Sequence, residues 1–419
     1  MIKSHVPHPL DLGLFIHAPP EHRAHVINAA SLNAGLRALG VMPRWVTMNP
    51  RNTSPALNPW DHLREAGLAE LAEVCPEEVV NCAEHIVDQW RPTVEELELV
   101  TALAGMRAVY VHYYPPFWAP LVELFRREGT CVALHVQLFH QSPAREFQFD
   151  FAAGARDAVL SADRVMVSQE ADVSVLEEKL GIERARIHIL PKSVPPRALE
   201  RARAVRRGEI KSKCDALFAA SRGNVARLLY LGRLEPIKNI AYFLEKCMPA
   251  LEKRTKDFEV LVVGTGRDEK RVIEAARGLR NVTVIIASLP YEDVLALIGL
   301  ADLAVFPSGF DYAPRFPLEA LLLGVPCVLG GFHFNQRYWP HAIVVPPAGE
   351  STTRLEYSGQ TVVYGIPDAE ALAAAIDRFI DTGAADHRAQ LTALDRESHP
   401  VHAARVLLQA FGLDAGVVK

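Results

Sequence analysis

The chain has 419 residues, of which 49% are hydrophobic, and its formal net charge at pH 7 is −5. This length exceeds what one hydrophobic core usually organises, so two domains are expected. The small negative charge gives no overall attraction to nucleic acid or to an anionic bilayer, and neither a signal peptide nor an apolar run of about 18 residues or more is present. We therefore expect a cytoplasmic protein without an integral membrane segment or a nucleic-acid partner.

Short β-favouring runs alternate with amphipathic helical stretches through the first half of the chain, which is typical of a parallel sheet covered by helices. The predicted strands are 12–17, 44–48, 108–112, 131–135, 164–167 and 187–190. Helices fit between them, for example at 28–39, 118–127 and 171–180. Residues 1–195 are therefore predicted to form a first Rossmann-like domain.

Residues 196–224 differ from their surroundings, because Pro195-Pro196 opens a stretch dense in arginine and lysine with few large apolar residues. We interpret this stretch as a basic interdomain linker. Its cations could instead bind an anionic acceptor or a membrane surface. Because glutamates are interspersed and no aromatic anchors accompany the charges, a solvated helix face is favoured.

A second series of strands and helices follows this stretch. Its strands are predicted at 227–231, 259–263, 282–286, 303–306 and 327–329, with a helix at 318–323. The pattern predicts a second doubly wound domain over residues 225–400. The last predicted helix covers residues 401–411.

Two cations follow the first strand of this second domain, in the run Gly232-Arg233-Leu234-Glu235-Pro236-Ile237-Lys238. Both are predicted to project from the carboxyl end of the sheet, where ligands bind in open α/β sheets. Arginine offers a bidentate fork and lysine a point charge, a pairing suited to a diphosphate. The alternative is an ordinary surface loop that holds two cations.

Two carboxylates, Asp311 and Glu319, follow a later strand and are separated by seven residues. The first is predicted in a loop and the second inside a helix, whose N-terminal amides point toward an anion. Their presence favours the interpretation of Arg233 and Lys238 as an anion-binding pair.

From residue 227 to about 376 the order of motifs resembles retaining glycosyltransferases of the GT-B fold, most closely glycosyltransferase family 4. The motifs are the Gly-Arg-Leu-x-Pro-x-Lys-Asn run, Val262-Val263-Gly264-Thr265-Gly266, Pro290-Tyr291-Glu292-Asp293, the carboxylate pair and Gly324-Val325-Pro326. The resemblance implies an α/β architecture in which two doubly wound Rossmann-like domains face an interdomain crevice. It further implies that residues 1–195 bind the acceptor, that residues 225–400 bind a nucleotide sugar, and that residues 401–419 cross back to the first domain.

Carried over by motif position, the resemblance assigns donor roles to residues of the second domain. Arg233 and Lys238 would neutralise the leaving diphosphate. Asp311 would hold hydroxyl groups of the donor sugar, and Glu319 would accept hydrogen bonds from those of the ribose. The other expected donor contacts, from side chain or backbone, are Gly232, Ile286, Tyr312, Ala313, Arg315 and Phe316.

Two departures from the family pattern fall beside the expected sugar. The first carboxylate is Asp311 where the family usually has glutamate, which shortens its reach by one methylene. Pro314 stands where glycine is common, and proline removes one amide donor. These departures favour an uncommon donor sugar or weakened catalysis.

Two histidines end predicted strands of the first domain. His135 closes the run Val132-Ala133-Leu134-His135 and resembles a family histidine near the reacting sugar carbon, so a sugar-positioning and charge-stabilising role is predicted for it. His112 ends an earlier strand. For His112 a role in the acceptor site and a purely structural role stay equally open.

The loop after the first predicted strand holds Glu21, His22 and Arg23 where many relatives have a glycine-rich turn. These larger residues prevent the same close backbone approach, so we expect the loop to shape an acceptor pocket particular to this protein. His17 and His25 lie nearby, but placement on a strand, a loop and a helix would scatter such zinc ligands, and no metal site is predicted.

The sequence contains no Asp-x-Asp motif of the kind that holds a metal in many transferases. Arg233, Lys238 and the helix start near Arg315 are expected to stabilise the leaving diphosphate instead. The resemblance thus implies transfer with retention, without metal or other cofactor, from a nucleotide sugar to a small-molecule or glycan acceptor.

Two alternatives keep the same fold. In the first alternative, the chain is a pseudo-glycosyltransferase, or an N- or S-glycosyltransferase of specialised metabolism. In the second it is a catalytically degenerate protein that binds a sugar nucleotide. The joint presence of Arg233, Lys238 and Glu319 disfavours the second, because a decayed site is expected to lose at least one of them.

Overall fold

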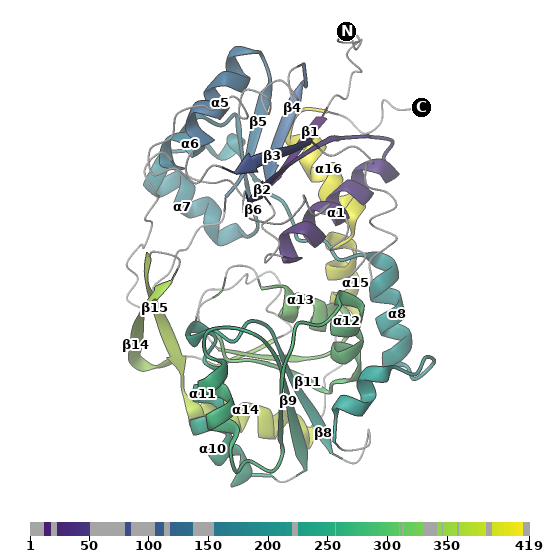
Figure 1. Cartoon of the computed structure of the whole chain (residues 1–419), viewed down its shortest axis with the longest axis vertical. Coiled ribbons are helices and arrows are strands. Elements are labelled where there is room, and N and C mark those ends of the chain that lie inside the picture. Colours follow the sequence, from purple (N-terminus) through teal and green to yellow (C-terminus); the bar gives the residue numbers. More distant parts are fainter. Residues whose placement is uncertain are drawn as a thin grey trace. The chain divides into compact units, whose positions relative to one another are not determined.

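The computed structural model describes residues 12–17, 23–50, 80–84, 105–112, 118–136, 155–219, 225–255, 257–309, 311, 314–330, 342–345, 347–357, 360–382 and 388–413. They form two compact units. The first contains the described residues up to 136, then 155–195 and 396–413, and the second contains those from 196 to 395. Each unit is built on one parallel sheet (Figure 1).

The first unit has a seven-stranded parallel sheet in the order β3-β2-β1-β4-β5-β6-β7. Its strands are β1 (Leu12–His17), β2 (Arg44–Pro50), β3 (Val80–Glu84), β4 (Ala108–His112), β5 (Cys131–His135), β6 (Arg164–Val167) and β7 (Ile187–Ile189). The strand order reverses between β1 and β4. In open α/β sheets this switch point is where ligands bind, at the carboxyl ends of the strands.

Helices of the first unit connect these strands and pack against the sheet. They are α1 (Arg23–Ala38), α5 (Trp118–Arg127), α6 (Ala155–Ser161), α7 (Glu170–Leu180), the 3-10 turn η1 (Arg184–Arg186) and α16 (Pro400–Ala410). The C-terminal helix α16 packs beside α1 within this unit (Figure 1). Gly35 of α1 permits this approach, because a Cβ atom there would lie 2.1 Å from the carbonyl oxygen of Pro400.

The second unit has a six-stranded parallel sheet in the order β10-β9-β8-β11-β12-β13. Its strands are β8 (Ala226–Leu231), β9 (Phe258–Gly264), β10 (Val282–Ile286), β11 (Leu303–Phe306), β12 (Cys327–Gly330) and β13 (Ala342–Val345). Here the order reverses between β8 and β11. A separate antiparallel hairpin joins β14 (Pro347–Tyr357) to β15 (Gln360–Pro367).

Helices alternate with these strands along the chain. They are α8 (Pro196–Arg206), the 3-10 turns η2 (Lys213–Leu217) and η3 (Pro236–Lys238), α9 (Ile240–Tyr242), the π-helical η4 (Phe243–Cys247), α10 (Met248–Glu252), α11 (Glu269–Ala276), α12 (Tyr291–Leu300), α13 (Arg315–Leu322), α14 (Ala369–Thr382) and α15 (Arg388–Glu397). The central strands β9 and β11 are buried at every residue. Such continuous burial is what a parallel sheet needs when helices cover both faces.

The predicted α/β class with two doubly wound parallel sheets is confirmed. Three features were not predicted from the sequence, namely the edge strands β3 and β13 and the β14–β15 hairpin. The hairpin interrupts the strand-helix alternation on which the prediction relied. The helix expected at 318–323 begins earlier, at Arg315, because Pro314 takes an extended conformation at its N-cap and Pro317 is tolerated in a first helical turn.

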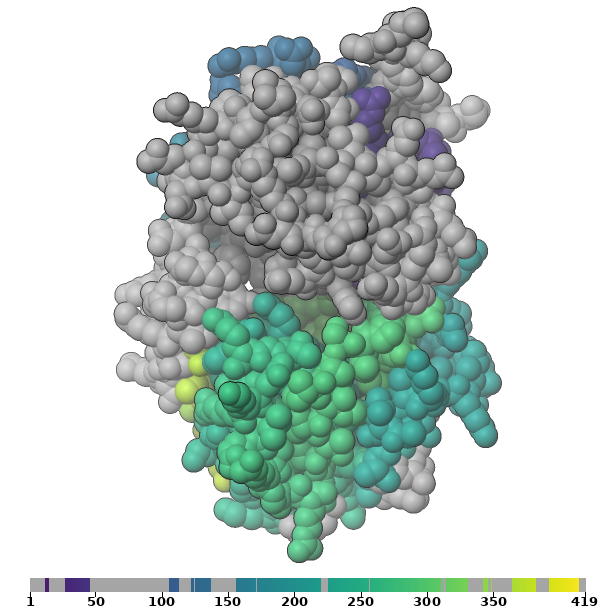
Figure 2. Space-filling view, in the orientation of Figure 1, coloured from purple at the N-terminus to yellow at the C-terminus, as the bar shows by residue number. Residues whose placement is uncertain are grey.

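The stretch predicted as a basic linker forms helix α8 and the turn η2, and both belong to the second unit. Helix α8 packs beside α12 and lies at the surface of this unit (Figure 2). Arg206 donates hydrogen bonds to the carbonyl oxygens of Gly299 and Ala301, at the end of α12, and of Gly324, just after α13. The basic helix therefore holds the C-terminal ends of two helices of its own unit.

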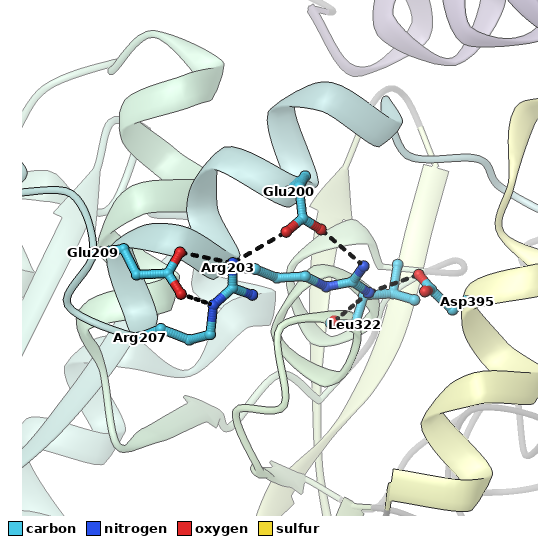
Figure 3. Close-up of polar contacts among 6 residues, drawn as sticks. All are labelled: Glu200, Arg203, Arg207, Glu209, Leu322 and Asp395. Atoms are coloured by element: carbon cyan, nitrogen blue, oxygen red, sulfur yellow. Dashed lines mark hydrogen bonds and ion pairs between the residues drawn. The ribbon is translucent and has the colours of Figure 1, made fainter.

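Arg203 of α8 and Arg207, the residue after α8, also bind residues of the second unit. Figure 3 shows the polar network of Glu200, Arg203, Arg207, Glu209, Leu322 and Asp395. Arg203 lies 2.7 Å from the Asp395 carboxylate, and Arg207 lies 2.7 Å from that of Glu209. These pairs match the favoured interpretation of a solvated helix face and give no support to an anionic acceptor or membrane site.

Candidate functional site

The predicted anion-binding residues of the second unit lie at the switch point of its sheet. Arg233 and Lys238 follow β8, and Asp311 follows β11, the strand that pairs with β8. Because both strands are parallel, the residues after them emerge at the same edge of the sheet. The structure therefore brings together side chains that the sequence places more than 70 positions apart.

Lys238 and Asp311 form a close ion pair. The ammonium Nζ of Lys238 lies 2.6 Å from Oδ2 of Asp311, and 5.7 Å from the ring centroid of Phe306, at the end of β11. Lys238 is only 6% exposed. Burial lowers the pKa of Lys238 from its usual 10.5, and the charge and hydrogen bond of Asp311 act in the opposite direction. The cation is thus held in place by a carboxylate and an aromatic face before any ligand binds.

The loops that carry this pair are fastened to each other. Asn239 has a left-handed backbone with φ of 56°, a conformation that asparagine tolerates, and it ends the turn η3. Its side-chain amide donates to the carbonyl oxygens of Pro307 (3.1 Å) and Gly365 (2.9 Å). The amide of Gly309 donates to the carbonyl oxygen of Ile237 at 2.9 Å. Two hydrogen bonds, one from the Asn239 side chain to Pro307 and one from the Gly309 amide to Ile237, therefore fix the Lys238 loop relative to the Asp311 loop.

Arg233 lies in the same electrostatic environment as this pair. Its side chain is exposed, and its charge is one of the influences that lower the pKa of Lys238. The Tyr230 hydroxyl donates to the carbonyl oxygen of Arg233 at 2.8 Å, which fixes the backbone after Gly232. The Arg233 side chain is thus exposed on a fixed backbone, whereas Lys238 is buried and paired.

The Gly264-Thr265-Gly266 segment packs against the loop that carries Arg233. A Cβ atom on Gly264 would lie 1.9 Å from the carbonyl oxygen of Gly232, so glycine is required for this close approach. The amide of Leu234 donates to the carbonyl oxygen of Thr265 at 2.7 Å. In this protein the glycine of the strand end serves the packing of the cation-bearing loop.

The second carboxylate, Glu319, is buried and hydrogen-bonded. It is 3% exposed and lies on α13 one turn after Arg315. Its Oε1 atom accepts hydrogen bonds from the Tyr291 hydroxyl (2.6 Å) and from Nε of Arg315 (2.9 Å). Tyr291, the first residue of α12, belongs to the Pro290-Tyr291-Glu292-Asp293 motif, but no role was predicted for it.

The other predicted donor residues divide into three groups. The Phe316 side chain packs in an aromatic cluster with Tyr230 and Phe306, so a donor contact from this residue rests on its backbone amide. Ile286 ends β10 and is 38% exposed, which leaves an apolar surface at the carboxyl edge of the sheet. Tyr312 and Ala313 lie outside the described residues.

In the first unit, both predicted histidines end adjacent strands and face one another. His112 and His135 occupy paired positions on β4 and β5, with ring centroids 5.2 Å apart. Tyr110 lies on the same face of β4 as His112, and its hydroxyl hydrogen-bonds Nδ1 of His112 (2.9 Å) and Nδ1 of His135 (2.6 Å). Nε2 of His135 hydrogen-bonds the Ser168 hydroxyl at 2.9 Å.

The Tyr110–His112–His135 cluster is buried, and burial determines the protonation state of His112. Burial, with the neighbouring charges of His135 and Lys192, holds the pKa of His112 well below 6.5, so His112 is neutral at neutral pH. Both ring nitrogens of His135 are engaged by protein groups, Tyr110 and Ser168, which were not foreseen as partners. The spacing of Tyr110 and His112 by two positions on one strand was the available signal for the first contact.

The predicted acceptor loop is described only at its end. Glu21 and His22 lie outside the described residues, and Arg23 is the first residue of α1. Within the described parts of the chain, no group of three or more histidine, cysteine or acidic side chains is arranged to hold a metal ion. Among the described helices, none is both long and apolar enough to cross a membrane.

The sequence of the second unit matches a known family. Residues 226–382 match the family model described as glycosyl transferases group 1, and this span contains Arg233, Lys238, Asp311 and Glu319. Glycogen synthase of Mycobacterium tuberculosis (strain CDC 1551 / Oshkosh) is 31% identical over 187 residues, which is 43% of this chain and 40% of that protein. The chain therefore matches less than half the length of this curated relative.

Solved structures resemble the fold over nearly the whole chain. A glycosyltransferase from Rickettsia africae ESF-5 has a TM-score of 0.63 at 13% identity, covering 98% of this chain and 100% of that one. UDP-GlcNAc 2-epimerase from Neisseria meningitidis, bound to UDP-GlcNAc, has a TM-score of 0.56 at 12% identity, covering 95% and 98%. At such low identity these likenesses show the GT-B fold, and an epimerase shares it with a glycosyltransferase.

Proposed function

We propose that this protein is a glycosyltransferase that takes a sugar from a nucleoside-diphosphate donor, which its second unit binds. The observation that carries the proposal is the pair of the buried Lys238 with Asp311 at the switch point of the second sheet, inside the span that matches group 1 glycosyltransferases. A buried cation can stabilise the charge that develops on a departing diphosphate, since it is already positioned and its surroundings are poor in water.

In the proposed reaction the bond between the anomeric carbon and the diphosphate oxygen breaks, and the negative charge passes to the diphosphate. Lys238 and Arg233 stabilise that charge without a metal ion. Asp311, 22% exposed beside Lys238, accepts hydrogen bonds from the donor sugar. The acceptor bonds to the same face of the sugar, which retains the anomeric configuration, and a donor phosphate oxygen takes the acceptor's proton.

The first unit is proposed to bind the acceptor. The Tyr110–His112–His135 cluster lies at the carboxyl ends of its central strands, where the family resemblance expects sugar-positioning groups. His135 shares both ring nitrogens with protein partners, so it acts through its fixed position and not as a proton acceptor. His112, neutral and buried, belongs to the same framework.

The first test is a calorimetric screen of the protein against UDP, GDP, ADP and dTDP and their common sugar conjugates, with and without EDTA. We expect one diphosphate to bind in the presence of EDTA and to lose at least about tenfold in affinity in Arg233→Ala. Arg254→Ala removes an arginine from a surface pair with Glu370 and serves as the control. If none of these nucleotides or sugar conjugates binds the wild type, the donor site is refuted.

A second measurement separates a transferase from a protein that only binds a sugar nucleotide. Slow hydrolysis of the bound sugar nucleotide without acceptor, followed by NMR, reports both turnover and the configuration of the released sugar. Release with retained configuration supports the proposed mechanism. Tight binding with no hydrolysis and no transfer to a panel of sugar acceptors would favour a degenerate binding protein.

A further inference from the structure

Three buried side chains of the second unit form a closed set of hydrogen bonds. The Tyr291 hydroxyl lies 2.6 Å from Oε1 of Glu319, and Nε of Arg315 lies 2.9 Å from the same oxygen. A second nitrogen of Arg315 donates to the Tyr291 hydroxyl at 2.8 Å, and its guanidinium carbon lies 5.5 Å from the tyrosine ring centroid. The tyrosine comes from α12 and the other two from α13.

Burial makes this arrangement rigid. Glu319 and Tyr291 are 3% and 6% exposed, and the Arg315 side chain is 10% exposed. A buried carboxylate requires a compensating cation and hydrogen-bond donors, and Arg315 supplies both. Burial also raises the pKa of Tyr291 well above 10, so its hydroxyl keeps a proton to donate.

The two hydrogen bonds that the Glu319 carboxylate accepts from described residues both use Oε1. The carboxylate is therefore held from one side, and its rotation is restricted. The helices that carry the three residues are also fixed at their far ends, because Arg206 binds carbonyl oxygens at the end of α12 and just after α13. Neither helix can shift without breaking these bonds.

We propose that Tyr291 and Arg315 are positioning residues that hold Oε1 of Glu319, so that Oε2 is directed to the ribose hydroxyls of the donor. This inference rests on the proposed function, in which Glu319 accepts hydrogen bonds from the ribose hydroxyls. It adds the two residues that fix the orientation of Glu319. Preference for a ribonucleotide over its 2′-deoxy counterpart then depends on Tyr291 and Arg315, whereas affinity for the diphosphate depends on Lys238.

The test measures the affinity ratio between a ribonucleoside diphosphate and its 2′-deoxy counterpart by calorimetry on the full chain. The probes are UDP, GDP and ADP with their 2′-deoxy forms, and inorganic pyrophosphate reports the diphosphate contacts alone. The variants are Tyr291→Phe, which removes one hydroxyl and keeps the ring, and Arg315→Lys, which keeps the charge and removes the fork. Tyr242→Phe and Arg254→Lys are the matched controls in the same unit.

We expect the ribose preference to fall about three- to tenfold in each variant, as expected for one charge-assisted hydrogen bond. Pyrophosphate affinity should stay within about twofold in Tyr291→Phe, and in both variants the donor KM should rise more than kcat falls. If wild type and both variants share the same ribose preference while binding UDP, GDP or ADP, the positioning role is wrong. If the wild type binds no nucleotide, the proposed donor site fails, and this inference with it.

Discussion

Replacement of Lys238 by methionine tests the centre of the proposed site. The change keeps an unbranched side chain that is one atom shorter, and it removes a cation that is 6% exposed and lies 2.6 Å from Oδ2 of Asp311. It leaves the ring of Phe306 in contact with an apolar chain instead of an ammonium group. The nearby Arg233 stays in place as the second cation.

The expected loss of turnover follows from the role of a fixed cation beside a leaving group. Removing one preorganised stabiliser of transition-state charge typically costs a factor of about 10² to 10³, or about 2.7 to 4 kcal/mol. Stability should fall less. Breaking a fully buried ion pair costs about 3 to 5 kcal/mol, and Asp311 is 22% exposed, so we expect about 1 to 2 kcal/mol.

The assay combines donor turnover with thermal or urea unfolding of the same preparations. Lys246→Met removes an exposed lysine of η4 in the same unit and controls for the loss of a positive charge. The double variant Lys238→Met/Asp311→Asn removes both charges of the pair. It should regain stability relative to the single variant, because no unpaired carboxylate is left, but turnover should remain low.

Near-normal turnover of Lys238→Met, with an intact fold, would refute the reasoning. It would mean that the buried pair only stabilises the two loops. A large loss that the double variant reverses would also contradict it, since the loss would then come from the carboxylate of Asp311 that has lost its cation and not from the missing cation itself.

Two further predictions concern single residues. Asp311→Asn removes the charge that raises the pKa of Lys238, so that pKa should fall further below 10.5. Because Lys238 is charged only below its pKa, diphosphate binding should be lost at a lower pH than in the wild type as pH rises, and an unchanged alkaline limit in calorimetry would contradict this. Gly35→Ala places a Cβ atom 2.1 Å from the carbonyl oxygen of Pro400, so α1 and α16 must separate. Thermal unfolding should show a loss of about 1 to 3 kcal/mol, and an unchanged midpoint would contradict the packing.

The parallel sheets could be predicted from sequence because their strands carry strong local signals. Runs such as residues 108–112 and 303–306 are apolar and short, and turn or helix patterns bound them. Six predicted strands, β1, β4, β5, β6, β10 and β11, match the observed bounds residue for residue. The edge strand β3 was missed because its sequence, Val-Asn-Cys-Ala-Glu, contains one β-branched residue and no aromatic one, and β13 was missed although it reads Ala-Ile-Val-Val.

The individual cations and carboxylates could also be found in the sequence, from their positions after predicted strands. The sequence could not show which atoms they contact. Lys238 was predicted as a diphosphate ligand and Asp311 as a sugar ligand, and the structure adds that they bind each other. That contact depends on β8 and β11 being neighbours, which is a property of strand order.

Elsewhere in the molecule, too, the residue types could be predicted from the sequence, but the contacts between their side chains could not. By itself the sequence determined the alternation of strands and helices, the chemical types at the strand ends and the basic character of residues 196–224, because these depend on local pattern. Only the tertiary structure decided that Tyr291 binds Glu319 and that Tyr110 binds His135. Hydrogen bonds between residues far apart in the chain form only after the backbone has brought them within about 3 Å, and no local pattern encodes that distance.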